Sequence, residues 1–103
     1  MTGSYVRVAG VAEIPEGSKK AFEVGGKSVL VCHAAAGWFA VSNICSHASE
    51  KLECGRMRGG WIGCPVHGAR FELATGKALG LPAKEPIATY AMRIVGDSIE
   101  ILV

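Results

Sequence analysis

Two short segments, Cys45-Ser46-His47 and Cys64-Pro65-Val66-His67, are separated by sixteen residues and decide how this chain is interpreted. Each segment offers one thiol and one imidazole. Two thiolates and two imidazoles suit a two-iron centre with cysteines on one iron and histidines on the other. Tetrahedral zinc accepts the same ligand types, so ligand type alone leaves both metals open. The order favours iron–sulfur, because zinc fingers usually keep their cysteines together and their histidines together.

The spacing C-x-H followed by C-x-x-H resembles the Rieske [2Fe–2S] family. The match covers residues 45–68, and residues 80–82 (Gly-Leu-Pro) are similar to the proline-bearing loop that covers the cluster in that family. The resemblance implies an all-β fold, namely an antiparallel β-sandwich that carries a small cluster-binding subdomain. It also implies one Rieske-type [2Fe–2S] cluster per chain. Cys45 and Cys64 would bind one iron, and His47 and His67 would bind the other.

Four positions distinguish this chain from the high-potential Rieske proteins of respiratory chains. Those proteins have two further cysteines, joined by a disulfide, where this chain has Glu50 and Val66. They have a serine and a tyrosine that donate to cluster or ligand sulfur where this chain has Ala69 and Phe71. Hydrogen bonds to sulfur stabilise the added electron, so their loss lowers the reduction potential. We expect a midpoint on the order of −150 mV, near the bottom of the Rieske range.

This pattern is similar to that of the small ferredoxins of bacterial aromatic-ring dioxygenases. The resemblance implies a one-electron carrier in aromatic hydrocarbon catabolism. Its donor would be an NADH-dependent flavoprotein ferredoxin reductase, and its acceptor a terminal Rieske non-haem iron oxygenase. Two alternatives stay open: a Rieske small subunit of another reductase or oxidase, such as nitrite reductase, and a zinc-stabilised binding module.

The chain itself is not expected to be an enzyme. A non-haem oxygenase iron needs two histidines and a carboxylate, but only His33 remains once the cluster takes its two of the three histidines. No nucleotide-binding glycine turn opens a helix. We expect a small docking patch with charged neighbours. Its predicted members are His47, His67, Leu81 and Pro82, with Glu50, Lys51 and Glu53 beside them.

Length and composition indicate a single domain over residues 1–103, with a cluster-binding portion at about 43–84. The net charge is only +2, and the basic residues are scattered, which argues against nucleic-acid binding. The N-terminal residues lack an apolar signal core, and no run is long enough to span a membrane. We therefore expect a cytoplasmic monomer with no membrane partner.

Short β-like runs separated by glycine turns indicate antiparallel strands. The expected strands cover residues 5–8, 21–24, 27–31, 38–41, 61–63, 70–73, 90–95 and 98–102. Cys32 is expected to be a small buried core residue and Cys54 a thiol without a role, with no disulfide between them in a reducing cytosol. His33 is expected to be an ordinary turn or half-buried residue.

Overall fold

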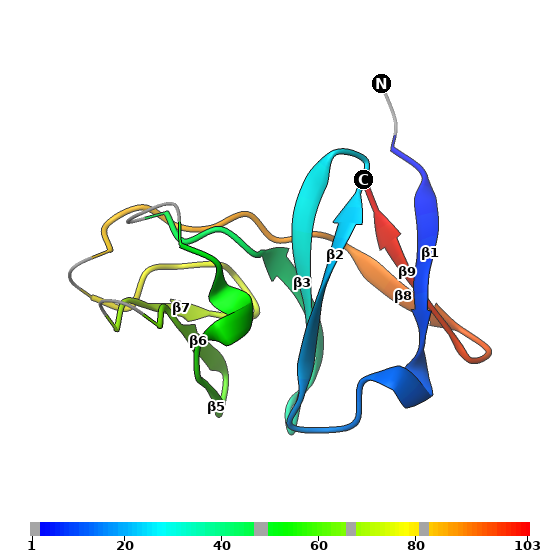
Figure 1. The fold of residues 1–103 in the computed structure, drawn as a ribbon, viewed down its shortest axis with the longest axis horizontal. Coiled ribbons are helices and arrows are strands. Elements are labelled where there is room, and N and C mark those ends of the chain that lie inside the picture. Colours follow the sequence, from blue (N-terminus) through cyan, green and yellow to red (C-terminus); the bar gives the residue numbers. More distant parts are fainter. Residues whose placement is uncertain (1–2, 47–49, 66–67, 81–82) are drawn as a thin grey trace.

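A computed structural model describes residues 3–46, 50–65, 68–80 and 83–103 of the chain. Within them the strands form three antiparallel sheets, ordered β1-β9-β8, β2-β3-β4 and β5-β6-β7, which lie in succession along the molecule (Figure 1). This confirms the all-β prediction. The elements are β1 (Tyr5–Gly10), the 3₁₀ helix η1 (Val11–Glu13), β2 (Lys19–Val24), β3 (Lys27–Ala34), β4 (Gly37–Ser42), the 3₁₀ helix η2 (Leu52–Cys54), β5 (Met57–Arg58), β6 (Trp61–Gly63), β7 (Arg70–Glu72), β8 (Met92–Val95) and β9 (Ser98–Leu102).

The middle strand β3 of the central sheet β2-β3-β4 is buried on both faces. Alternate residues of a strand point to opposite faces, so a strand covered on both sides reads as a continuous apolar run. In β3, Val29 and Val31 join the core that the central sheet shares with β1 and β9. Leu30 and Cys32, between and beside them, join the core on the other face, toward β6 and β7. The central sheet therefore separates two hydrophobic cores.

The β2–β3 hairpin has the predicted two-residue turn. Val24 pairs with Lys27, and the intervening Gly25 and Gly26 have φ of 58° and 79°. Positive φ at both turn positions is the geometry that glycine adopts without steric cost. This turn fixes the register in which β3 presents its two sets of side chains to the two cores.

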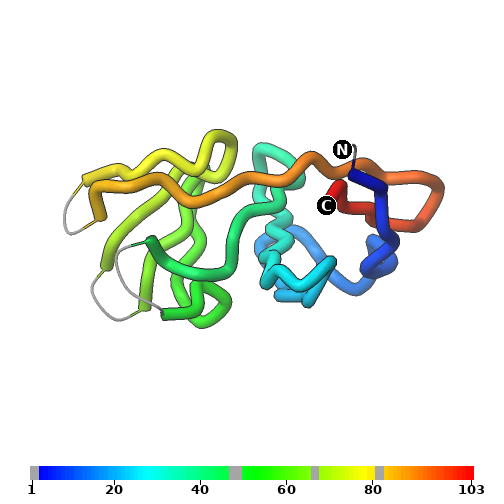
Figure 2. Tube along the Cα trace, turned by 90° about the horizontal axis from the view of Figure 1, so that it is seen from above, coloured from blue at the N-terminus to red at the C-terminus, as the bar shows by residue number. Residues whose placement is uncertain are grey.

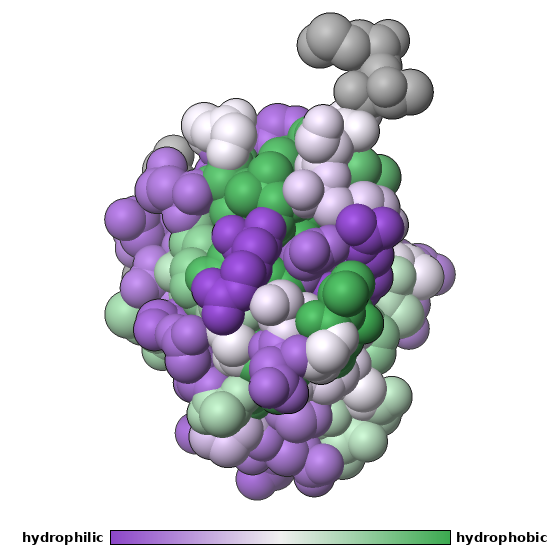
Figure 3. Space-filling view, turned by 90° about the vertical axis from the view of Figure 1, so that its right-hand side faces the viewer, coloured by the Kyte–Doolittle hydropathy of each residue, from purple (hydrophilic) through white to green (hydrophobic). Residues whose placement is uncertain are grey.

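The outer sheet β1-β9-β8 closes the end of the molecule that carries both termini (Figure 1). On its outer side the Arg93 guanidinium lies 3.9 Å from the centre of the Tyr5 ring, and Arg93 Nε donates to Glu100 Oε1 at 2.6 Å. Seen from this side, hydrophobic residues form separate groups among hydrophilic ones (Figure 3). The sheet thus has an apolar inner face and a mixed outer face.

The sheet β5-β6-β7 forms the opposite end of the molecule. The chain returns from it to the outer sheet as a long extended segment over residues 83–91, which runs along the length of the molecule (Figure 2). Backbone bonds fix this segment to β4: Ser42 N–H donates to Ala88 O, and Tyr90 N–H to Ala40 O. Because Tyr90 pairs with β4, the last hairpin begins at Met92 rather than at residue 90, as the sequence had suggested.

The other predicted strands are all present: those over 61–63 and 98–102 have the predicted ends, and the ends of the rest differ by at most three residues. The short β5 was not predicted, because two residues carry no readable alternation. No helix among the described residues has the length and apolar character needed to cross a membrane.

Candidate metal centre

Cys64 lies directly after β6, at the start of the turn that leads to β7. Its N–H donates to Ala69 O at 2.6 Å, and its carbonyl accepts the N–H of Gly68 at 3.1 Å. Gly68 has φ of 72°, a conformation that side-chain-bearing residues rarely adopt. These bonds hold the cysteine at the tip of the β6–β7 hairpin, where the sequence placed the second ligand segment.

Cys45 lies at one end of a second closed segment. Its N–H donates to Glu50 O at 2.8 Å, and Ile44 and Lys51 form an isolated antiparallel bridge beside it. The Ser46 hydroxyl donates to Glu85 O at 2.5 Å. The first ligand segment is therefore joined both to its own far end and to the returning segment 83–91.

Asn43, two residues before Cys45, is a buried polar residue that the sequence analysis did not single out; 1% of its surface is exposed. Its Nδ2 donates to Glu53 Oε1 at 2.8 Å and to Ser28 Oγ at 3.1 Å, and its Oδ1 accepts the Glu53 N–H at 2.9 Å. Its backbone carbonyl also accepts the Leu52 N–H. Asn43 thus connects the start of the Cys45 segment to η2 and to β3. Only the three-dimensional arrangement reveals this role.

The two cysteines share one buried cluster of apolar side chains. Cys45 is 3% exposed and Cys64 is 4% exposed. The neighbours that pack in the same cluster include Leu52, Ile62, Ala69, Phe71, Leu73, Ala83 and Ile87. Two thiols in one buried apolar cluster fit soft metal ligands that must be kept from water.

The other two predicted ligands, His47 and His67, lie outside the described residues, as do Leu81 and Pro82 of the predicted docking patch. Within the described part of the chain no group of three or more histidine, cysteine, aspartate or glutamate side chains comes together. Of the four predicted ligands, the structure therefore describes only Cys45 and Cys64. The assignment of all four residues as ligands stays a prediction.

Ala69 and Phe71, the two positions that differ from high-potential relatives, are fully buried in this cluster. Phe71 lies on β7 opposite Ile62 of β6 and presents an aromatic ring with no hydroxyl. Neither side chain can donate a hydrogen bond to sulfur. This agrees with the low midpoint expected from the sequence, which stays a prediction.

The remaining cysteines and the third histidine have structural surroundings. Cys32 is fully buried in β3, and burial raises the pKa of its thiol to about 12 against the opposing effect of the Lys19 charge. Cys54 is an exposed thiol, so no disulfide joins the two. His33 is half-buried, bonds Ile14 O through Nδ1 at 2.9 Å, and stacks on Trp38 with ring centres 3.8 Å apart. The prediction of a buried Cys32 and a half-buried His33 is confirmed.

Of the charged residues predicted to flank a docking patch, Glu50 and Lys51 are exposed. Glu53 is also exposed, but its carboxylate and its N–H are both bonded to Asn43. Its charge is therefore part of the local scaffold.

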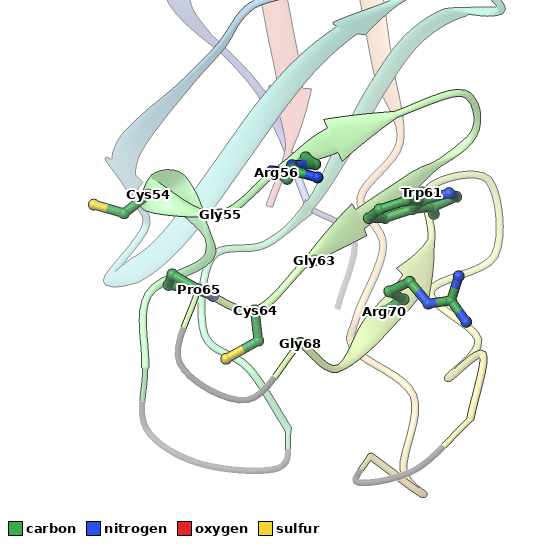
Figure 4. Close-up of a pocket in the computed structure, with 9 residues that line it drawn as sticks. All are labelled: Cys54, Gly55, Arg56, Trp61, Gly63, Cys64, Pro65, Gly68 and Arg70. Atoms are coloured by element: carbon green, nitrogen blue, oxygen red, sulfur yellow. The ribbon is translucent and has the colours of Figure 1, made fainter.

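A groove of about 560 Å³ opens beside Cys64 on the outer side of the β5-β6-β7 sheet (Figure 4). Figure 4 shows the Cys64 side chain directed toward the tip of the β6–β7 hairpin, and the Trp61 ring and the Arg70 side chain on the other side of Gly63. The groove is lined by Cys54, Gly55, Arg56, Trp61, Gly63, Cys64, Pro65, Gly68 and Arg70.

The sequence and the structure are both similar to known proteins. The model of the Rieske [2Fe-2S] domain family matches residues 4–91. The ferredoxin component of the naphthalene 1,2-dioxygenase system of Pseudomonas aeruginosa is 33% identical over 101 residues, which are 98% of this chain and 97% of the relative. The ferredoxin of carbazole 1,9a-dioxygenase from Nocardioides aromaticivorans IC177 has a TM-score of 0.90 and 34% identity, covering 95% of this chain and 96% of its own.

A ferredoxin solved in complex with the reduced oxygenase of carbazole 1,9a-dioxygenase has a TM-score of 0.88 but is 21% identical, covering 95% of this chain and 92% of its own. That likeness shows the shared fold alone. The family match covers most of the chain, and the buried cysteine pair fits the thiolate half of the family's ligand set. The chain therefore belongs to the Rieske [2Fe-2S] domain family, whose cofactor is a Rieske-type [2Fe–2S] cluster.

Proposed function

We propose that this protein is the ferredoxin of an aromatic-ring dioxygenase system. In this role it takes single electrons from an NADH-dependent flavoprotein reductase and passes them to a terminal Rieske non-haem iron oxygenase. The observation that carries the proposal is the pair of cysteines buried in one apolar cluster at one end of a small chain. The relatives that are about one-third identical along nearly their whole length are ferredoxin components of such systems.

We assign Cys45 and Cys64 to one iron, and His47 and His67 to the other. When bound, the cluster supplies reversible one-electron chemistry at low potential. The described residues would hold the two thiolates and exclude water from them: Leu52, Ile62 and Phe71 have no exposed surface. Residues 43–84 would form the cluster-binding portion of a single domain over residues 1–103.

The proposed carrier is a monomer that acts in the cytoplasm, where NADH is available to its donor. A Rieske small subunit of another reductase, such as nitrite reductase, is the alternative within the same fold. The retention of all four ligand residues in the sequence favours an electron carrier.

Reconstitution tests this function. Purified protein should show acid-labile sulfide and, when reduced, a rhombic EPR signal of a histidine-ligated two-iron cluster. Added to reductase, oxygenase, NADH and naphthalene or biphenyl, it should make product formation depend on its concentration. Product formed equally well without it would show that it is not the carrier.

Ligand variants test the site. Replacing Cys45, His47, Cys64 or His67 singly by serine or alanine should abolish the visible absorption of the cluster. The matched control is Cys54→Ser, which removes an exposed thiol and should keep full cluster content. If one of the four variants kept the spectrum unchanged, that residue would not be a ligand.

A further inference from the structure

The outer face of the β5-β6-β7 sheet carries a row of three residues, Arg56, Gly63 and Arg70. Gly63 N–H donates to Arg56 O at 2.7 Å, and Gly63 pairs with Arg70 in the β6–β7 register. The adjacent row contains Ile62 and Phe71, which have no exposed surface. Because side chains alternate between faces, the row with the arginines must face outward.

The glycine at the centre of this row leaves a space between two cationic side chains. A Cβ at Gly63 would lie 3.2 Å from Cζ3 of Trp61, so the indole ring lies against the glycine and lines one side of this space. The Arg70 guanidinium lies 5.4 Å from the centre of the Trp61 ring. These residues form one part of the groove in Figure 4, and Cys64 lines another. We call this space the arginine groove.

Both arginines are exposed, and among the described residues neither has a carboxylate partner or a side-chain hydrogen bond. One carboxylate on this sheet, that of Glu72, lies opposite Trp61 and accepts the Thr75 hydroxyl at 2.6 Å. Guanidinium groups bind carboxylates through paired, charge-assisted hydrogen bonds. The arginine groove therefore offers two available carboxylate-binding groups close to a proposed cluster ligand.

We propose that the arginine groove receives carboxylate side chains of the terminal oxygenase and so guides its docking beside Cys64. This inference rests on the proposed function. Charge complementarity selects the occupant, because an acidic surface would satisfy both arginines at once. A carrier that binds briefly needs a small polar contact, and opposite charges at such a contact raise the association rate.

The test uses the cluster-loaded protein and three single variants. Arg56→Gln and Arg70→Gln each remove one charge from the groove. Lys27→Gln is the matched control, because it removes one exposed positive charge from the β2–β3 hairpin on a different sheet. Each protein is reduced chemically and mixed with oxidised oxygenase in a stopped-flow instrument, and the second-order rate constant is measured at two salt concentrations.

We expect each arginine variant to transfer electrons about 3- to 10-fold more slowly at ~20 mM salt, because a rim charge acts mainly on association. At ~500 mM salt the difference from the unmodified protein should fall below about twofold, since charges are then screened within a few ångströms. Lys27→Gln should stay within about twofold at both concentrations. The midpoint potential should be the same in all four proteins, which excludes a change in driving force.

Binding of the two oxidised proteins, measured by calorimetry at low salt, separates docking from electron transfer. If the two arginine variants bind more weakly and Lys27→Gln does not, the result supports docking at the arginine groove. If electron transfer is then absent in all proteins, the proposed function fails while the docking proposal stands. Equal binding and equal rates in all variants would overturn the groove. So would an equal loss in Lys27→Gln or a loss that persists at high salt.

Discussion

The contacts of Asn43 predict that this one side chain stabilises the start of the Cys45 segment. Asn43→Ala removes its bonds to Glu53 and Ser28 and leaves the Glu53 N–H without its acceptor. Because Asn43 is 1% exposed, water cannot easily replace the lost partners. The change should therefore both destabilise the fold and loosen the attachment of η2 to the first ligand segment.

The expected magnitude follows from the bonds lost. Each of the two neutral bonds contributes about 0.5–1.5 kcal/mol, and the bond to the Glu53 carboxylate about 1.5–3 kcal/mol. Glu53 is exposed, so its carboxylate regains part of this energy from water. We expect a loss of about 3 kcal/mol, which lowers a urea midpoint by about 2 M at a typical slope for a small domain. Ser28→Ala, which removes one neutral bond, should cost about 1 kcal/mol.

The assay is urea denaturation of the cluster-loaded protein, followed by tryptophan fluorescence and by bleaching of the visible absorption. Asn43→Ala should bleach earlier than Ser28→Ala. Asn43→Asp keeps the shape of the side chain but replaces Nδ2, which lies 2.8 Å from Glu53 Oε1, by a carboxylate oxygen, and the two carboxylates should repel each other and lower stability. Adding Glu53→Gln to this variant replaces one carboxylate by an amide and should restore stability. The reasoning would be refuted if Asn43→Ala were no less stable than Ser28→Ala.

Three further outcomes are expected. Gly55→Ala should reduce cluster content severely, because a Cβ there would lie 1.7 Å from the backbone oxygen of Gly63. The clash is between two backbone segments, so no side-chain rotation can relieve it. Normal iron content in this variant would contradict the expectation. Phe71→Tyr should raise the midpoint potential by about 40 mV, because a hydrogen bond from the new hydroxyl to a sulfur that gains charge strengthens by about 1 kcal/mol on reduction. Potentiometry measures the midpoint potential, and an unchanged or lower value would contradict the expectation. Iodoacetamide at pH 8 should alkylate exposed Cys54 and leave Cys32 intact, because burial raises the Cys32 pKa to about 12 and its thiolate is scarce. Mass spectrometry of the folded protein measures the alkylation of each cysteine. Faster alkylation of Cys32 than of Cys54 would contradict the expectation.

Local sequence patterns predicted the strands well because alternation, glycine turns and the apolar run of β3 are local signals. Gly25 and Gly26 determine a hairpin by their own conformations. The two cysteines were identified from their spacing to histidines, which is also local. These features need no knowledge of which distant residues meet.

The features that the sequence did not predict depend on distant contacts. Asn43 acts through Ser28 and Glu53, which lie 15 and 10 residues away along the chain. The row that contains Arg56 and Arg70 exists because β5, β6 and β7 pair in one register, and a two-residue β5 has no periodicity to read. The predicted start of the last hairpin at residue 90 was wrong for the same reason, since Tyr90 pairs with β4.

The two-sided burial of β3 has a consequence for how this chain can vary. Val31 and Cys32 are consecutive residues, yet they pack into cores on opposite sides of one sheet. A volume change at Val31 is felt by the scaffold near the termini, whereas the same change at Cys32 is transmitted toward the cysteine pair. Substitutions at the odd-numbered positions 29 and 31 of β3 therefore alter the core beside β1 and β9, whereas those at the even-numbered positions 30 and 32 alter the core that contains Cys45 and Cys64.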